Sequence, residues 1–338
     1  MYHSESGFLN KINDNIEIKN YDAPEPEDDE VTVEQAYSGV CFRDILTKQG
    51  FFPRVALPII PGHEIGGTIV KKGKNVKSFS IGDKVSSLIY VPCGKCEFCL
   101  TGRENLCPNK KSFGETLNGG YSKYVNVNTS SLVKVPPGVP EEAIPIAACV
   151  TAMLVHAIVK MGRIERGDNV LITGAGGGVG VHAIQIVKAY GGHPIAETSS
   201  QWKEEELYKL GADHIVHASD DFNADVKKLG GADIVLEDVG IRTFNKSLRS
   251  LKTGGRMIVI GNLNPEPVSL PLGLIILKGN TIKGSITSTR EDLKIALDLN
   301  ASGKVKPIIG RKINISEINR AYDAMLAREI FGRVLVEY

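Results

Sequence analysis

The sequence has no excess of charge of one sign. Its 338 residues carry 40 Lys and Arg against 39 Asp and Glu, which gives a formal net charge of +1. We therefore expect no large basic surface for general binding of nucleic acids and no acidic tail. Uninterrupted apolar runs of 18 residues are also missing, and the first residues lack the apolar core of a signal peptide. We expect a cytoplasmic protein without a membrane partner.

Cysteine is scarce, with six residues in the chain. In the reducing cytoplasm these are expected to be thiols or metal ligands rather than disulfides. Four of them follow the spacing Cys-x2-Cys-x2-Cys-x7-Cys, which lets the thiolates converge on one point and leaves a bound zinc ion no open position. Four unconnected thiols are the alternative, which such regular spacing disfavours. We predict a structural zinc site at Cys93, Cys96, Cys99 and Cys107.

The length of the chain exceeds what one hydrophobic core usually serves, so we expect two domains. Short strand-like segments with frequent turn signals run from Val31 to about Val135, which favours an all-β, barrel-like domain. After a cluster of Pro and Gly at 135–140, apolar strands alternate with helical segments, a pattern typical of a parallel sheet covered on both faces. The predicted fold is α/β, with domains at 1–138 and 139–285. A returning segment at 286–338 is expected to hold one helix, at 290–300, followed by extended pieces.

A glycine-rich segment follows the first of these strands, at Thr173–Gly180, and precedes a helix predicted at 179–189. It does not match Gly-x-Gly-x-x-Gly strictly. Small residues nevertheless let the backbone approach a pyrophosphate, and the helix N-terminus supplies amide donors. An ordinary strand-to-helix turn is the alternative, but the further strand–helix alternations favour a dinucleotide. The expected cofactor-binding residues of the loop are Gly176, Gly177, Gly178, Val179 and Gly180.

The end of the second strand indicates which dinucleotide binds. An acidic residue at position 198 would bind a free ribose 2′-hydroxyl and repel a 2′-phosphate. The chain instead has Thr198, Ser199 and Ser200, with Lys203 just beyond, so we predict NADPH. Glu197 stands one residue earlier, where strand alternation is expected to direct it to the other face. A shift of register by one residue would reverse the preference for NADPH.

Three motifs occur in the order Pro61-Gly62-His63-Glu64-x-x-Gly67, the four-cysteine lobe and the Ala/Gly-rich loop. Together they resemble the zinc-type medium-chain dehydrogenase/reductase superfamily over essentially the whole chain. The resemblance implies a GroES-like β-barrel catalytic domain and a Rossmann domain with a doubly wound parallel sheet, with the active site in the cleft between them. It also implies a homodimer or homotetramer joined through a sheet edge at 274–286, and cofactor contacts from Thr151, Gly261 and Arg333.

In the alcohol dehydrogenases of this superfamily, a catalytic zinc is held by a Cys, by the His of the Gly-His-Glu motif and by a later Cys. Cys41, His63 and Glu64 match this pattern, and Asp44 matches a residue that orients the histidine. The later cysteine is expected at position 147, but here it is Cys149. On an α-helix two residues rotate a side chain by about 200°. We therefore expect Cys149 to point away, so that a zinc site of Cys41, His63 and Cys149 would need local rearrangement.

A second departure concerns Arg43, which replaces the Ser or Thr that relays the alcohol proton in those dehydrogenases. Both departures favour hydride addition to an activated carbon–carbon double bond, which needs no Lewis acid because the substrate's own carbonyl accepts the charge. The quinone and enoyl reductases of the superfamily carry a segment such as Phe42-Arg43-Asp44. The chain is similar to the archaeal acryloyl-CoA reductases at 43–46, 49–54, 149–151 and 177–185.

The resemblance thus implies NADPH-dependent reduction of a small α,β-unsaturated acyl-CoA. The candidate catalytic residues are Cys41, Arg43, Asp44, His63 and Glu64. Two other functions stay open. A zinc-dependent alcohol or semialdehyde dehydrogenase would use the same cysteines and His63, and a non-catalytic nucleotide-binding protein could be built on the same fold.

Overall fold

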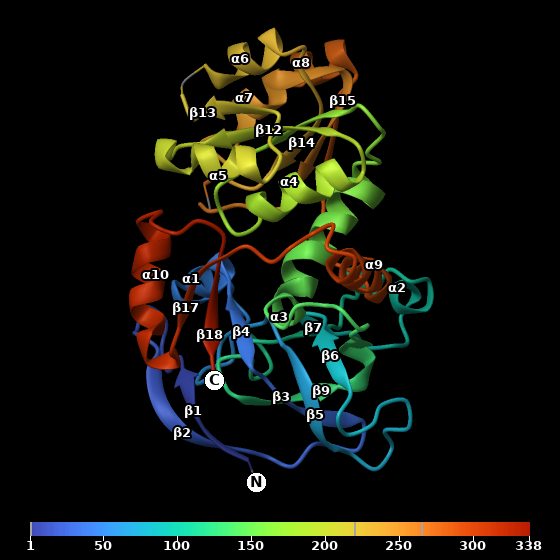
Figure 1. The fold of residues 1–338 in the computed structure, drawn as a ribbon, viewed down its shortest axis with the longest axis vertical. Helices are drawn as coiled ribbons and strands as arrows, with labels where there is room; N and C mark the ends of the chain where they lie inside the picture. Colours follow the sequence, from blue (N-terminus) through green and yellow to red (C-terminus); the bar gives the residue numbers. More distant parts are fainter. Residues whose placement is uncertain (1, 220, 265) are drawn as a thin grey trace. The chain divides into compact units, whose positions relative to one another are not determined.

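The computed structural model describes residues 2–219, 221–264 and 266–338, and the chain divides into two compact units. Unit 1 consists of Met1–Ala152 together with Thr287–Tyr338, and unit 2 is Met153–Ile286 (Figure 1). Unit 1 therefore continues past residue 138, to Ala152, and is completed by the C-terminal segment.

Unit 1 is built mainly from antiparallel strands, as the sequence predicts. A five-stranded sheet has the order β10-β6-β5-β3-β9, and a three-stranded sheet has the order β17-β18-β4. Two further pairs are β1-β2 and β7-β8. Alternate residues of β3 and β5, among them Val31, Val33 and Ile69, are fully buried in one apolar core. The strands are β1 (Tyr2–Phe8), β2 (Glu17–Ala23), β3 (Glu30–Glu34), β4 (Tyr37–Val40), β5 (Gly66–Lys72), β6 (Lys84–Ser87), β7 (Tyr90–Val91), β8 (Lys111–Ser112), β9 (Tyr124–Asn128), β10 (Leu132–Lys134), β17 (Ile309–Ile313) and β18 (Arg333–Glu337).

The helices of unit 1 include two in the C-terminal segment, where the sequence analysis predicts one. The expected helix is α9 (Arg290–Ala301), and the missed one is α10 (Ile318–Leu326). Its signal was present, because Ile318, Ala321, Tyr322 and Met325 recur at helical spacing and pack on the core of unit 1. The remaining helices are α1 (Phe42–Lys48), α2 (Glu97–Leu100) and α3 (Ala143–Ile146), with 3-10 turns η1 (Glu104–Leu106), η2 (Thr129–Ser131) and η6 (Ile315–Glu317).

The helix that follows α3 is not α-helical. Its backbone forms π-helical turns, η3 (Ala147–Ala152) and η4 (Val155–Met161). Ser288 donates its Oγ hydrogen to the carbonyl oxygen of Ala148 at 3.0 Å. In the described part of the chain, Ala143–Met161 is the one helix long and apolar enough to cross a membrane, but 72% of it is buried inside the protein. Such burial is typical of a core helix in a soluble fold.

Unit 2 holds a six-stranded parallel sheet in the order β13-β12-β11-β14-β15-β16. Numbered within the unit, this is the order 3-2-1-4-5-6 of the Rossmann fold, which confirms the predicted fold class. The strands are β11 (Asn169–Ile172), β12 (His193–Thr198), β13 (His214–His217), β14 (Ala232–Glu237), β15 (Leu251–Val259) and β16 (Thr281–Gly284). The helices are α4 (Gly180–Ala189), α5 (Glu204–Lys209), α6 (Phe222–Lys228), α7 (Phe244–Ser250) and α8 (Leu272–Lys278), with a 3-10 turn η5 (Gln201–Lys203).

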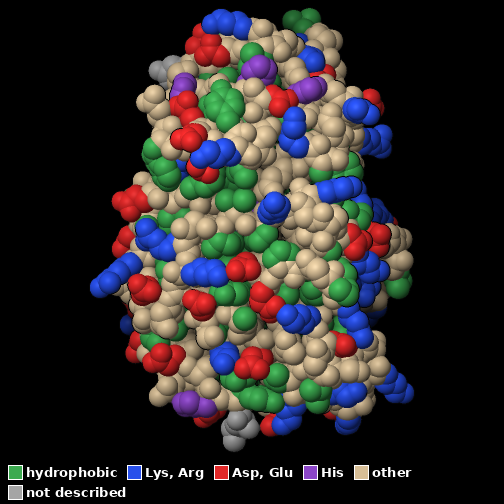
Figure 2. All heavy atoms as spheres, in the orientation of Figure 1, with side chains coloured by type: hydrophobic (Ala, Val, Ile, Leu, Met, Phe, Trp, Pro, Cys, Tyr) green, Lys and Arg blue, Asp and Glu red, His purple; other side chains and the backbone are tan. Residues whose placement is uncertain are grey.

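The sheet edge predicted at 274–286 is only partly extended. Its first residues belong to α8, and the edge strand β16 begins at Thr281 and pairs with β15. Three apolar side chains of α8 are strongly exposed: Leu272 at 65%, Ile276 at 77% and Leu277 at 86%. In contrast, the face drawn in Figure 2 carries Lys, Arg, Asp and Glu side chains intermixed among its described residues.

Candidate active site

The site begins where β4 ends and α1 starts. Cys41 is the N-cap of α1, and the Asp44 carboxylate at the third helical position accepts the Cys41 backbone N–H at 2.9 Å through Oδ2. A carboxylate is favoured here because the first turn of a helix leaves its N–H groups without partners. The cap therefore places the Cys41 thiol and the Asp44 carboxylate at the same end of α1.

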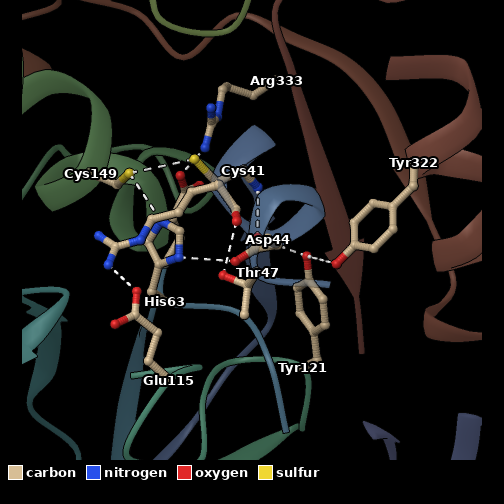
Figure 3. Close-up of polar contacts among 11 residues, drawn as sticks. Cys41, Asp44, Thr47, His63, Glu115, Tyr121, Cys149, Tyr322 and Arg333 are labelled. Atoms are coloured by element: carbon tan, nitrogen blue, oxygen red, sulfur yellow. Dashed lines mark hydrogen bonds and ion pairs between the residues drawn. The ribbon is translucent and has the colours of Figure 1, made fainter. Parts of the chain in front are cut away.

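His63 joins this pair from the loop before β5. It is 3% exposed, and its Nδ1 lies 3.0 Å from Asp44 Oδ1 (Figure 3). Its other ring nitrogen, Nε2, lies 3.3 Å from the Sγ of Cys149. When Nδ1–H donates its hydrogen bond to a carboxylate, the proton stays on Nδ1 and Nε2 carries the free lone pair that a metal ion requires.

Cys149 points toward the site, and the expectation that it points away is wrong. Its Sγ lies 4.0 Å from the Sγ of Cys41. The expected rotation of about 200° assumed an α-helix, but this residue belongs to the π-helical turn η3, whose wider i→i+5 pattern changes the direction of each side chain. The ligand atoms of Cys41, His63, Glu64 and Cys149 all lie within 4.8 Å of one another. Two sulfurs and an imidazole form a donor set that fits zinc with a position left for water or substrate.

The charges around these donors favour a thiolate at Cys41. Its contact with Cys149, assisted by the nearby Arg333 and His63, holds the pKa of Cys41 well below its ordinary value. Burial acts to lower the pKa of His63, but the charge and hydrogen bond of Asp44, together with Cys41, raise it to about 9. A thiolate is the form of cysteine that binds metals.

Glu64, the residue after His63, is fully buried. Its carboxylate forms an ion pair with Arg333 of β18. The second oxygen, Oε2, has no hydrogen-bond partner among the described residues. Residue 39 must be glycine here, since a Cβ on Gly39 would lie 1.7 Å from that oxygen. Arg333, predicted to contact the cofactor, is thus held inside unit 1 by Glu64.

Arg43 is fixed from two sides. It forms an ion pair with Glu115, and its guanidinium lies 4.8 Å from the centre of the Phe52 ring. The contact of Cys149 with Cys41 and its burial raise the pKa of Cys149 well above its ordinary value, and the positive charge of Arg43 acts in the opposite sense. Glu115 is not among the predicted site residues, because no local pattern links it to Arg43, which lies 72 positions away.

The four-cysteine lobe forms a second donor cluster. The Sγ atoms of Cys93, Cys96, Cys99 and Cys107 lie within 4.8 Å of one another. The Cys93 backbone N–H donates to the Sγ of Cys107 at 3.4 Å. Backbone N–H groups of Lys95 and Cys96 lower the pKa of Cys93 to about 6. Four converging sulfurs fit a tetrahedral structural zinc.

The glycine-rich loop of unit 2 connects β11 to α4. Gly174 has a φ of +62°, and a Cβ on Gly180 would lie 2.4 Å from Ala175 Cα, so the loop needs glycine at both positions. His182 of α4 is fully buried and donates from Nδ1 to the carbonyl oxygen of Gly178 at 2.8 Å. His182 is not among the predicted site residues, and in the structure it anchors this loop.

The end of β12 lies against the same loop. Glu197 is 2% exposed and accepts the Gly174 backbone N–H through Oε2 at 2.9 Å. Thr198 accepts the Ser200 backbone N–H, and Lys203 donates from Nζ to the Gly176 carbonyl oxygen at 3.2 Å. The Glu197 carboxylate is therefore engaged by the loop, while Ser199 is exposed.

The other two predicted cofactor contacts belong to different units of the chain. Thr151 is 1% exposed within η3, and Gly261 follows β15. A Cβ on Gly261 would lie 2.5 Å from the carbonyl oxygen of Asp238, so a larger residue does not fit there.

Comparison with known protein families agrees with this arrangement. Residues 27–137 match the alcohol dehydrogenase GroES-like domain, and residues 178–302 match the zinc-binding dehydrogenase family. The chain belongs to the zinc-type medium-chain dehydrogenase/reductase family and is a nicotinamide-dependent oxidoreductase.

The similar proteins include some named acryloyl-coenzyme A reductase and others named alcohol dehydrogenase. The acryloyl-coenzyme A reductase of Sulfurisphaera tokodaii is 40% identical over 315 residues, which cover 93% of this chain and 94% of that protein. An alcohol dehydrogenase of Geobacillus stearothermophilus is 34% identical over 98% of both chains. The crystal structure of AibC matches with a TM-score of 0.92 at 33% identity, covering 99% of this chain and 96% of that one.

The His182 anchor predicts a loss of stability in acid. Burial lowers the pKa of His182 to about 4, whereas an unfolded histidine titrates near pH 6.5. Above about pH 6.5 the side chain is neutral in both states, and below it the unfolded state gains the proton first. The free energy of unfolding should therefore fall by up to about 3 kcal/mol between about pH 6.5 and pH 4 because of this residue.

Urea unfolding at several pH values measures this effect. His182→Gln should flatten the acid limb, and His214→Gln, at an exposed histidine of β13, should leave it as in the unchanged protein. Equal acid limbs for His182→Gln and the unchanged protein would contradict a buried, neutral His182.

Proposed function

We propose that this chain is an NADPH-dependent reductase of the carbon–carbon double bond of a small α,β-unsaturated acyl-CoA. Arg43 is the observation that carries the proposal. The alcohol dehydrogenases that the chain resembles have a hydroxyl at this position to relay the alcohol proton. A guanidinium cannot relay a proton, because it does not deprotonate in proteins. It is well suited to stabilise negative charge that develops on an oxygen. The likeness to an acryloyl-coenzyme A reductase supports the same substrate class.

The proposed reaction develops negative charge on the thioester oxygen, which is the group that Arg43 would stabilise. Bound NADPH would supply the hydride for the β-carbon. The electron pair of the substrate's double bond then moves to the thioester oxygen as an enolate, and the α-carbon takes a proton. Arg43 donates hydrogen bonds to the enolate oxygen, and Glu115 and Phe52 hold its guanidinium in place for this. Since Arg43 keeps its own proton, water or another side chain supplies the proton at the α-carbon.

We also propose two zinc ions per chain. Cys93, Cys96, Cys99 and Cys107 hold the structural one, and Cys41, His63 and Cys149 hold the other. A zinc ion at the second site would supply Lewis-acid polarisation of the substrate carbonyl. The sequence led us to expect an incomplete second site. The Sγ of Cys149 lies 4.0 Å from the Sγ of Cys41 and 3.3 Å from Nε2 of His63, which supports a complete set of three donors instead.

The same donors support a second candidate function, a zinc-dependent alcohol or semialdehyde dehydrogenase. The observation in its favour is the close grouping of Cys41, His63, Glu64 and Cys149. The observation against it is Arg43, which leaves no hydroxyl at the relay position.

The residues at the end of β12 support NADPH over NADH. Glu197 is buried and bonded to the loop backbone, so its carboxylate is not directed at the ribose. The exposed Ser199 and the half-buried Ser200 supply hydroxyls for a 2′-phosphate, and the buried Lys203, whose Nζ donates to the Gly176 carbonyl oxygen, adds a positive charge nearby.

We further propose a cytoplasmic homodimer or homotetramer. Strand β16 lies at the edge of the described six-stranded sheet, so one side of it can pair with another strand. Helix α8 precedes β16 in the chain, and its exposed Leu272, Ile276 and Leu277 form an apolar surface. Contiguous exposed apolar groups mark contact surfaces.

Arg43 allows a direct test of the reaction. With NADPH, kcat/KM for acryloyl-CoA should exceed that for succinic semialdehyde and for a quinone. Arg43→Gln should lower kcat/KM for acryloyl-CoA by roughly 100- to 1,000-fold, the effect of removing one donor to a developing oxyanion. Arg320→Gln, at an exposed arginine of α10, serves as control and should leave it unchanged. Faster turnover of the semialdehyde by the unchanged protein would favour the second candidate function.

Metal analysis tests the two zinc sites separately. The unchanged protein should contain two zinc ions per chain by inductively coupled plasma mass spectrometry. Cys149→Ala should retain one ion and its unfolding temperature. Cys96→Ala should also retain one ion but unfold at a lower temperature, because structural zinc contributes folding free energy. Two ions in Cys149→Ala would place the second metal elsewhere.

Light scattering coupled to size-exclusion chromatography tests the assembly. Ile276→Lys combined with Leu277→Lys should shift the molar mass toward 36.5 kDa, the mass of one chain, because charge opposes burial of this surface. Ile81→Lys, at an apolar residue that is 64% exposed in unit 1, is the control and should leave the mass unchanged. A single-chain mass for the unchanged protein would contradict the proposed oligomer.

A further inference from the structure

Two tyrosines far from each other in the sequence are buried together in the apolar core of unit 1. Tyr121 is fully buried and Tyr322 is 3% exposed, and they lie among aliphatic residues such as Ile45 and Ile318. A hydroxyl in such surroundings costs free energy unless it is hydrogen-bonded. Phenylalanine would fill the same space without that cost, so the two hydroxyls require an explanation.

The hydroxyls form a chain that ends on Asp44. Tyr322 donates to the hydroxyl oxygen of Tyr121 at 3.1 Å, and Tyr121 donates to Asp44 Oδ2 at 2.9 Å. Burial and the Asp44 charge raise the pKa of both tyrosines well above the ordinary value, so both hydroxyls keep their protons. Figure 3 shows Tyr322, Tyr121, Asp44 and His63 following one another toward the two cysteines.

Asp44 divides its two oxygens between two tasks. Oδ2 accepts from Tyr121 and from the Cys41 backbone N–H, while Oδ1 faces the Nδ1 of His63. With donors on both sides, the carboxylate plane has one orientation that satisfies all of them. Loss of the Tyr121 donor leaves Oδ2 with one partner and frees the carboxylate to rotate, which would disturb His63.

We propose that Tyr121 and Tyr322 are positioning residues of the metal centre: through Asp44 they hold His63 with Nε2 directed at Cys41 and Cys149, and so raise the zinc affinity of this site. The inference rests on the proposed zinc site at Cys41, His63 and Cys149. It connects α10, at the end of the chain, to a ligand in the loop before β5. In the hydrogen bonds of the described residues, neither tyrosine hydroxyl is bonded to Cys41, His63 or Cys149, so their effect passes through Asp44.

The matched control is a third tyrosine in the same core. Tyr338 packs on the same apolar cluster. It donates its hydroxyl at 2.7 Å to the carbonyl oxygen of Gly120, the residue before Tyr121. Its described hydrogen bonds do not include Asp44. Tyr338→Phe therefore removes a hydroxyl of the same core without touching the chain of bonds.

The test is metal affinity, measured by competition with a chelator on cobalt-substituted protein. Cobalt bound by two thiolates and an imidazole has absorption bands distinct from those of cobalt bound by four thiolates, so each site is followed separately. Tyr121→Phe should weaken binding at the Cys41 site by about 10-fold, the lower end of the effect of losing a hydrogen-bond partner of a metal ligand, because Tyr121 acts one step further out, through Asp44. Tyr322→Phe should weaken it less, and should have no further effect when combined with Tyr121→Phe. Tyr338→Phe and the four-cysteine site should show unchanged affinities.

The outcomes separate the inference from the proposed zinc site. If the unchanged protein lacks the bands of the Cys41 site, the zinc site is wrong and the inference falls with it. If the bands are present and Tyr121→Phe binds cobalt as tightly as the unchanged protein, the positioning role alone is overturned. If all three Phe variants weaken binding equally, the effect follows core stability, and the positioning role is again overturned.

Discussion

The candidate active site depends on the buried carboxylate of Asp44. It receives the backbone N–H of Cys41, the Nδ1 side of His63 and the hydroxyl of Tyr121, so it joins three segments of the chain. A buried carboxylate is tolerated only when such partners surround it. These segments therefore cannot separate without exposing or orphaning the charge, and the same contacts that stabilise the core of unit 1 also set the direction of the metal-binding groups.

The π-helical turn η3 supplies the other half of the site. It brings Cys149 to within 3.3 Å of His63, although its place in the sequence differs from that of the family's usual cysteine. Arg43 stands where the alcohol dehydrogenases have a hydroxyl. The result is a donor set suited to zinc beside a permanently charged guanidinium, a combination that favours stabilisation of an enolate over relay of an alcohol proton.

In unit 2 the buried Glu197, near the end of β12, stabilises the glycine-rich loop. Glu197 accepts a backbone N–H of the glycine-rich loop, and His182 holds the loop from its other end through Gly178. The loop is thereby fixed by side chains from β12 and α4 as well as by its glycines.

The sequence by itself determined the features that are local along the chain. Strand and helix periodicity gave the two kinds of domain, cysteine spacing gave the four-sulfur lobe, and short motifs gave His63 and the glycine-rich loop, because each of these patterns is complete within a few residues. Only the tertiary structure decided which distant side chains meet. The contacts of Cys149, which lies in a π-helical turn, differ from what α-helical spacing predicts. The bond between Tyr121 and Tyr322 joins residues 201 positions apart, and the partner of Arg43 lies 72 positions away. Such pairs arise from the packing of whole elements, so no segment of the sequence contains them.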